Sequence, residues 1–206
     1  MAKRLGFTLA EVLLTLGIIG VVAAITLPTL VNNIQEAQYK TAAKKAYSAA
    51  QNAYNSAISE NGGGFGPFST GTELSYTKFN AIKSKMNVIK ECRNGSGSFG
   101  KCWAKNGVGK VDAVSTGCQG FIVSFQNANT SFVTADGTAW MLYSYSDTTG
   151  ADYIAVDVNG AKPPNDWGKD AFIMTIYDTK LVLNSGICQY PRTDGTIITD
   201  FTYILN

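Results

Sequence analysis

Histidine is absent from the chain. Imidazole is the base of Ser–His and Cys–His nucleophile pairs and the commonest transition-metal ligand, so its absence excludes both chemistries from these residues. No motif of paired carboxylates takes its place. We therefore expect that the protein is not an enzyme. Its 206 residues suffice for one compact domain with an extended helix and are too few for two large domains.

Charge is scarce near the N-terminus. Between Phe7 and Gln35 the only charged residue is Glu11. Residues 12–27, with their flanks, are long and apolar enough to cross about 30 Å of hydrocarbon as a helix. Because a lone carboxylate in lipid is costly, Glu11 is expected to have a specific partner.

A short leader, residues 1–6, precedes this segment and carries Lys3 and Arg4. Basic residues on the short side of a membrane helix place that side in the cytoplasm. A secretory signal peptide is one alternative, but Glu11 interrupts its apolar region and no clean small-x-small cleavage site precedes a soluble start. A simple single-pass anchor is another alternative, and it gives Glu11 no purpose.

The run Gly6-Phe7-Thr8-Leu9-Ala10-Glu11, followed by apolar residues as far as Pro28, resembles the prepilin family. That family comprises type IV pilins and the pseudopilins of type II secretion and DNA-uptake machines. The resemblance implies cleavage between Gly6 and Phe7 by a prepilin peptidase and N-methylation of Phe7. It also implies that Glu11 is the assembly carboxylate. No motif of comparable strength covers the rest of the chain.

The resemblance also implies partners and a location. The partners are copies of the chain or homologous pilins in a helical filament, the prepilin peptidase, and an assembly platform at the bacterial inner membrane. The chain would cross that membrane once, with a cytoplasmic N-terminus and a periplasmic or extracellular domain, before it enters the filament. Pilus and secretion pseudopilus both remain open, as do major and minor subunit.

Two alternatives remain beside the filament subunit. One is a DNA-uptake (competence) pilin that binds DNA, and the other is a membrane-tethered binding module that never polymerises. Loss of Lys3 and Arg4 on cleavage lowers the basic residues from 17 to 15, equal to the 15 acidic ones. A neutral mature chain does not attract nucleic acid broadly, so no nucleic acid is expected as a partner.

The sequence predicts that the helix continues beyond the apolar run. Aromatic and small residues follow one another in steps of three and four, which places them on one helix face: Tyr39, Ala43, Tyr47, Ala50, Tyr54 and Ile58. The run Asn61-Gly62-Gly63-Gly64 should end the helix. Pro28 lacks an amide, so a kink or a local unwinding is expected there. The expected divisions are a leader (1–6), a transmembrane or filament-core half (7–31), an amphipathic half (32–61) and a globular domain (62–206).

The globular domain is expected to combine one short helix with a sheet. Ser75 or Thr77 is the predicted cap of a helix that reaches residue 91 and buries Phe79, Ile82, Met86 and Ile89. Beyond Gly120, short β-rich runs separated by turn residues predict antiparallel pairing at 121–125, 131–134, 139–146, 153–158, 172–177 and 180–183, with an edge strand at 201–205. The expected fold class is α+β, in which a long N-terminal helix, membrane-embedded in its first half, packs against this sheet.

Four cysteines lie beyond the apolar segment: Cys92, Cys102, Cys118 and Cys188. An even number in an exported domain suggests two disulfides, and three pairings are open. Cys92–Cys102 as a local bond and Cys118–Cys188 as a long-range bond are favoured, because the first closes a Gly/Ser-rich loop. Four buried free thiols are the alternative.

A second candidate site lies in the late part of the chain. Asp157, Asn159, Asn165 and Asp170 concentrate oxygen ligands among glycines between two expected strands. Calcium takes six to eight oxygens on irregular loops, and some type II secretion pseudopilins carry calcium in a comparable late loop. The alternative is a turn-rich connection built on Asx-turns. Calcium is thus the only candidate cofactor.

Three tryptophans, Trp103, Trp140 and Trp167, could form a stacking surface for single strands or glycans. Most aromatic residues of the chain fall in strand-like runs. Core packing is therefore the prediction.

Overall fold

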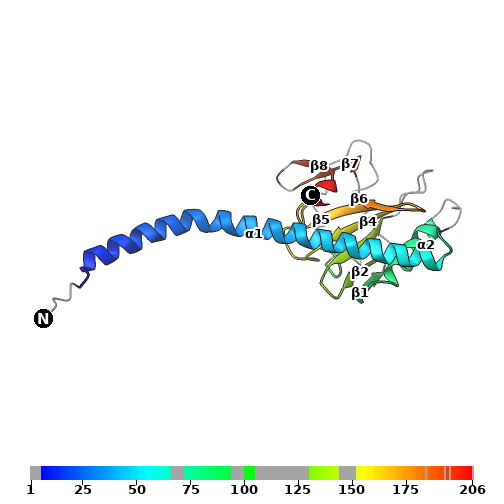
Figure 1. Ribbon diagram of the computed structural model, residues 1–206, viewed down its shortest axis with the longest axis horizontal. Helices are drawn as coiled ribbons and strands as arrows, with labels where there is room; N and C mark the ends of the chain where they lie inside the picture. The colour runs from blue at the N-terminus through cyan, green and yellow to red at the C-terminus, as the bar shows by residue number, and fades with distance from the viewer. Residues whose placement is uncertain are drawn as a thin grey trace. The chain divides into compact units, whose positions relative to one another are not determined.

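The computed structural model describes residues 6–65, 72–93, 100–104, 130–143, 152–183, 185–192, 194 and 196–205. Figure 1 shows its elements in chain order: α1 (Leu9–Glu60), α2 (Thr72–Lys83), β1 (Val88–Arg93), β2 (Thr130–Thr134), β3 (Ala139–Tyr143), β4 (Asp152–Asp157), β5 (Ala171–Ile176), β6 (Leu181–Leu183), β7 (Ser185–Pro191), β8 (Ile197–Asp200) and the 3₁₀ helix η3 (Thr202–Leu205). The predicted α+β class is confirmed. The chain divides into two compact units, Met1–Gln38 and Tyr39–Asn206.

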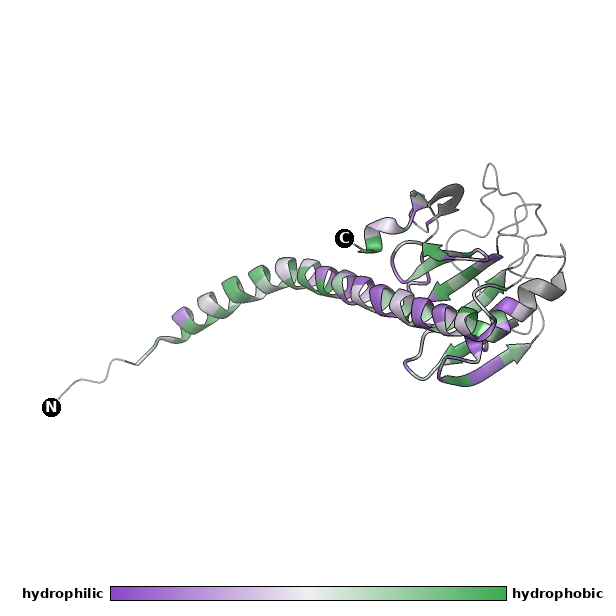
Figure 2. Ribbon diagram, turned by 45° about the vertical axis from the view of Figure 1, so that its right-hand side comes forward, coloured by the Kyte–Doolittle hydropathy of each residue, from purple (hydrophilic) through white to green (hydrophobic). Residues whose placement is uncertain are grey.

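The first unit contains the N-terminal part of α1. None of residues 6–38 is buried, and large apolar side chains such as Leu13, Ile19 and Ile25 are more than half exposed. Figure 2 shows that apolar residues predominate here, whereas polar bands alternate along the part of α1 within the second unit. The helix is long and apolar enough to cross a membrane, with a mean hydropathy of 2.3 over 18 residues. It continues through Pro28 without a break, so no local unwinding occurs there.

The second part of α1 packs against the sheet through small residues. They recur in steps of three and four, so they share one face of the helix. Most of their side chains belong to the same hydrophobic core as buried residues of β2 to β6. Two longer side chains reach the far edge of the sheet: Gln51 donates from Nε2 to the carbonyl of Leu181, and the hydroxyl of Tyr54 donates to the carbonyl of Tyr177 at 2.9 Å. The buried alanines of α1 are Ala43, Ala46, Ala50, Ala53 and Ala57.

Glycines end α1 where the sequence predicts. Gly62 and Gly63 have positive φ angles of 76° and 103°, a conformation that L side chains rarely adopt. The Gly63 amide donates to the carbonyl of Ile58 at 2.9 Å, which satisfies one carbonyl of the last turn.

The main sheet has six strands in the order β1-β2-β3-β4-β5-β6, and every neighbouring pair is antiparallel. Phe132, Trp140, Val156 and Phe172 are successive register partners, so they occupy one face. On that face Phe79 of α2 lies against Phe132, with ring centroids 5.3 Å apart. Every residue of β4 and β5 is buried, as expected for central strands covered on both faces.

The strands agree with most of the predicted runs. β2 to β6 correspond to the expected strands 131–134, 139–146, 153–158, 172–177 and 180–183, although residues 144–146 and the expected strand 121–125 lie outside the described residues. Trp103, Trp140 and Trp167 are each 2% exposed or less, which confirms core packing.

The predicted helix to residue 91 is wrong in its second half. α2 begins earlier, at Thr72, and ends at Lys83, and residues 88–93 form β1. Turn hydrogen bonds from the Lys85 and Met86 amides close the helix end. Val88 and residues 90–93 then pair with β2, and Ile89, at the register shift between them, is 65% exposed rather than buried.

The C-terminal region also differs from the prediction. The expected edge strand 201–205 is instead η3, because the side chain of Asp200 accepts hydrogen bonds from the backbone amide (2.7 Å) and hydroxyl (2.9 Å) of Thr202 and turns the chain. A two-stranded antiparallel sheet, β7-β8, precedes it and was not predicted. The turn around Asp194, which accepts from the Thr196 amide at 2.8 Å, was the available signal.

One ion pair inside the domain yields a prediction about stability. Lys78 of α2 lies 3.1 Å from Asp152 of β4, with side chains 1% and 7% exposed. Lys78→Met leaves the carboxylate buried without its cation, so the free energy of unfolding should fall by about 3–5 kcal/mol. Denaturant unfolding of the full chain in detergent measures this.

The matched control is Lys45→Met, which removes a surface pair 3.0 Å from Asp136 in which the lysine is 68% exposed. Its expected loss is below about 1 kcal/mol. Equal losses of unfolding free energy in the two variants would show that burial does not increase the contribution of the Lys78–Asp152 pair to stability.

Candidate functional site

The start of α1 is built as a capping box. The hydroxyl of Thr8 donates to Oε2 of Glu11 at 2.7 Å, and the Thr8 amide donates to the same oxygen at 2.8 Å. In return, the Glu11 amide donates to the Thr8 hydroxyl oxygen at 3.3 Å. This reciprocal pattern satisfies amides that a helix start otherwise leaves without partners.

The capping box gives Glu11 a partner within its own chain. Sequence reasoning looked for that partner elsewhere and missed Thr8, although Thr-x-x-Glu before an apolar run is the signature of a capping box. Thr8 supplies neutral donors, so the carboxylate still carries its charge without a described counter-ion. Phe7 and Glu11 line one shallow concavity with Val12 and Thr15, and Phe7 is 88% exposed. The predicted cleavage position and the predicted assembly carboxylate are therefore close together and accessible in this chain.

The loop between β4 and β5, residues 158–170, brings the four candidate calcium ligands together. Asp157 ends β4, and Asp170 immediately precedes β5 in the antiparallel pairing. The Asp170 carboxylate accepts the Asn165 amide at 2.8 Å and a hydrogen bond from the side chain of Asn159. Asp157 and Asp170 are both fully buried.

Three of these four residues carry a buried oxygen that accepts no hydrogen bond: Asp157 Oδ2, Asn159 Oδ1 and Asn165 Oδ1. Buried polar atoms are normally satisfied, so such a group of oxygens requires an explanation. Burial, together with the nearby Asp170 carboxylate, raises the pKa of Asp157 to about 9. A bound cation would be coordinated by these oxygens and would offset the repulsion between the two carboxylates.

The donor set restricts which cation would fit. Among the described residues no three Asp, Glu, Cys or His side chains converge on one point. Two carboxylates and two amide oxygens are hard ligands, which suit calcium better than a transition metal. Backbone carbonyls or water would have to complete the coordination.

The described residues include one of the two predicted disulfides. Cys92 at the end of β1 is bonded to Cys102, as predicted. The predicted Cys118–Cys188 bond lies outside the described part of the chain. Cys118 is not among the described residues, and only the backbone of Cys188 is described.

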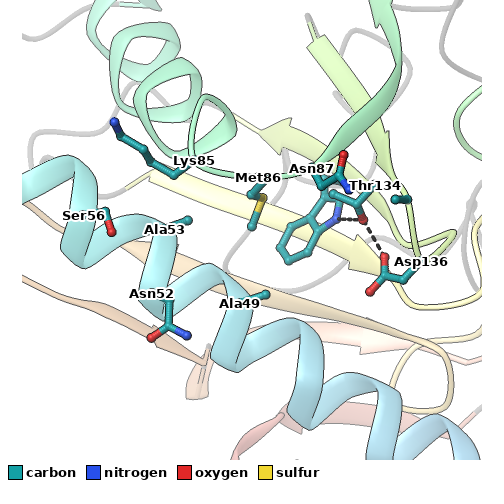
Figure 3. A pocket seen from close by; sticks show the side chains of 11 residues that line it. Ala49, Asn52, Ala53, Ser56, Lys85, Met86, Asn87, Thr134 and Asp136 are labelled. Carbon is teal, nitrogen blue, oxygen red and sulfur yellow. Dashed lines mark hydrogen bonds between the residues drawn. The ribbon is translucent and has the colours of Figure 1, made fainter.

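A groove of about 430 Å³ lies between α1, the turn after α2 and the β2–β3 turn (Figure 3). Its lining includes Ala49, Ala53 and Met86. Its charged side chains already have partners: Lys85 pairs with Glu60, and Asp136 pairs with Lys45. The Thr134 hydroxyl donates to Asp136 at 2.7 Å and accepts from the Trp140 indole at 3.1 Å, so these polar groups of the groove already have hydrogen-bond partners within the protein.

Comparison of the chain with protein-family models, with curated proteins and with solved structures finds no match.

The capping box leads to a prediction about Thr8. Thr8→Val keeps the shape of the side chain but removes the hydroxyl, so the first-turn amides should exchange their hydrogens about fivefold faster, as expected for loss of a cap worth about 1 kcal/mol. Thr8→Ser retains the hydroxyl and should exchange like the parent chain. Hydrogen exchange in detergent micelles measures both. Equal exchange in the two variants would show that the hydroxyl does not hold the helix start.

Proposed function

We propose that the chain is a structural subunit of a helical filament, either a type IV pilus or a type II secretion pseudopilus. The observation that carries the proposal is the register of Gly6, Phe7 and Glu11 ahead of an apolar helix. That helix has no buried residue between positions 6 and 38, yet it continues directly into the core of a folded domain. A helix with so much unpacked apolar surface requires lipid or other helices around it.

In the proposed pathway, a prepilin peptidase cuts between Gly6 and Phe7 and methylates the new amine. The apolar helix holds the subunit in the inner membrane, with the domain outside, until the assembly platform transfers it into the filament. There Glu11 pairs with the Phe7 amine of a neighbouring copy. Opposite charges in low dielectric attract strongly, and an unpaired carboxylate there is heavily penalised, so this pair sets the axial register.

Glu11→Gln separates the two roles of this side chain. Glutamine also serves in a capping box, so the helix start should remain intact, but the variant cannot form an ion pair. Filament yield should fall at least about tenfold, since a difference of 1.4 kcal/mol already suffices. Yield is measured by quantifying sheared filaments from cells that supply the peptidase and assembly platform.

Glu36→Gln is the matched control, because it removes a carboxylate from the same helix beyond the apolar run and should leave the yield unchanged. Intact mass of each variant should correspond to a chain that begins at N-methylated Phe7. A processed Glu11→Gln chain that assembles normally would rule out the assembly role and leave Glu11 with its capping role alone.

The buried oxygens of the β4–β5 loop favour a second function. We propose that Asp157, Asn159, Asn165 and Asp170 hold a calcium ion that stabilises the domain. The support is the three buried oxygens without hydrogen-bond partners and the adjacency of two buried carboxylates. When bound, the ion would supply positive charge and coordination; the chain itself supplies the position of the loop.

Calcium should therefore raise the thermal midpoint relative to chelator. At a hundredfold excess over the dissociation constant, the expected increase is about 5–10 °C. Asp157→Asn should abolish the increase, because it replaces a charged carboxylate, whose Oδ2 accepts no hydrogen bond, with a neutral amide. Asp136→Asn, in the β2–β3 turn, should keep it. An identical midpoint in calcium and in chelator would end the calcium proposal without affecting the filament proposal.

A further inference from the structure

The C-terminal segment, defined here as Arg192 and the described residues 196–205, attaches to three consecutive residues of the β4–β5 loop. Arg192 Nε lies 3.6 Å from Oδ2 of Asp166. The rings of Trp167 and Phe201 are 6.3 Å apart at 57°. The hydroxyl of Tyr203 donates to the carbonyl of Gly168.

The fit at Gly168 is close. Gly168 has a positive φ of 76°, and a Cβ at this position would lie 2.5 Å from the Tyr203 hydroxyl and 3.1 Å from Cγ1 of Ile198. Trp167 and Phe201 are 2% and 0% exposed. The attachment thus combines an ion pair, a hydrogen bond and a buried aromatic contact.

The first of these three loop residues, Asp166, is held by a candidate calcium ligand. All three lie between Asn165 and Asp170, and the Asp170 carboxylate accepts the Asp166 amide at 2.7 Å. The Asp166 carbonyl in turn accepts the amides of Lys169 and Ala171, at 3.1 and 3.3 Å. Asp170 is therefore bonded directly to the first residue of the attachment surface and lies close to that surface along the chain.

The charges within the loop are unevenly compensated. Asp166 has two cationic neighbours, Lys169 at 3.5 Å and Arg192. For Asp157 and Asp170, the described residues provide no ion pair within 4 Å, and Oδ2 of Asp157 is fully buried without a hydrogen bond. Two adjacent, buried carboxyl groups ionise together only at a high cost unless a cation lies between them, so a bound cation stabilises the closed loop.

We propose that a divalent cation in the β4–β5 loop controls attachment of the C-terminal segment to the domain. This inference rests on the calcium site proposed above. With the ion bound, Asp170 holds Asp166 to Gly168 in place and the segment is docked. Without it the loop opens, the segment detaches, and the Trp167 and Phe201 rings become accessible.

Hydrogen exchange of the full chain in detergent, with mass spectrometry of its peptides, tests this in calcium and in EGTA. The two peptides compared cover the β4–β5 loop and residues 196–205. If the segment opens only with the loop, a hundredfold excess of calcium over the dissociation constant should slow exchange in both peptides by up to about 100-fold. Asp157→Asn should remove the effect of calcium from both peptides.

The double variant Arg192→Gln/Tyr203→Phe separates attachment from metal binding, because both changes lie in the segment and leave all four candidate ligands in place. Calcium should still slow exchange in its loop but no longer in residues 196–205. A segment that still responds to calcium in this variant would overturn the proposed contacts.

Two results in the unaltered chain would also overturn the proposal, and they are distinguishable. If calcium slows exchange in the loop alone, the calcium site stands and its control of the segment is wrong. If calcium changes neither peptide, the calcium site itself is wrong and the inference falls with it. The filament proposal is independent of both results, because it is tested at Glu11.

Discussion

The close contact between the alanine face of α1 and the six-stranded sheet is the constraint on which the rest of the domain depends. Buried alanines such as Ala46, Ala50 and Ala53 belong to the same hydrophobic core as the side chains of β2 to β6, so this part of the helix lies against the strands. That proximity lets Gln51 and Tyr54 reach backbone carbonyls at the β5–β6 end. Because the domain uses only the second part of α1, the apolar first part is left for a different environment.

The periodicity of side chains correctly predicted the elements whose structure depends on neighbouring residues in the sequence. The helical face of residues 39–58, its glycine end and strands β2 to β6 each depend on side-chain spacing or turn residues within a few positions. Residues 84–91 were assigned wrongly because Met86 and Ile89 fit helical spacing. The strand state of residues 88–93 depends instead on pairing with β2, which lies some forty residues further along the chain. No local pattern contains that information.

For the candidate sites too, the sequence identifies the residues, whereas the fold determines what surrounds them. The local sequence pattern selected Glu11 and the four oxygen-bearing residues Asp157, Asn159, Asn165 and Asp170. Whether each oxygen has a partner depends on the fold. Glu11 receives donors from Thr8, three residues away, whereas Oδ2 of Asp157 is buried without any. The first partner was readable from the Thr-x-x-Glu spacing, but the second result follows only once β4 and β5 are paired.

The capping of Glu11 does not conflict with a role in assembly. A carboxylate accepts about four hydrogen bonds, and both donors from Thr8 go to one oxygen, Oε2. The other oxygen can still accept from an incoming amine. The neutral donors of Thr8 would lower the cost of placing the carboxylate in lipid, but they do not cancel its charge. A cation is therefore still attracted to the site, and a neighbouring N-terminal amine would meet a carboxylate already fixed at the helix start.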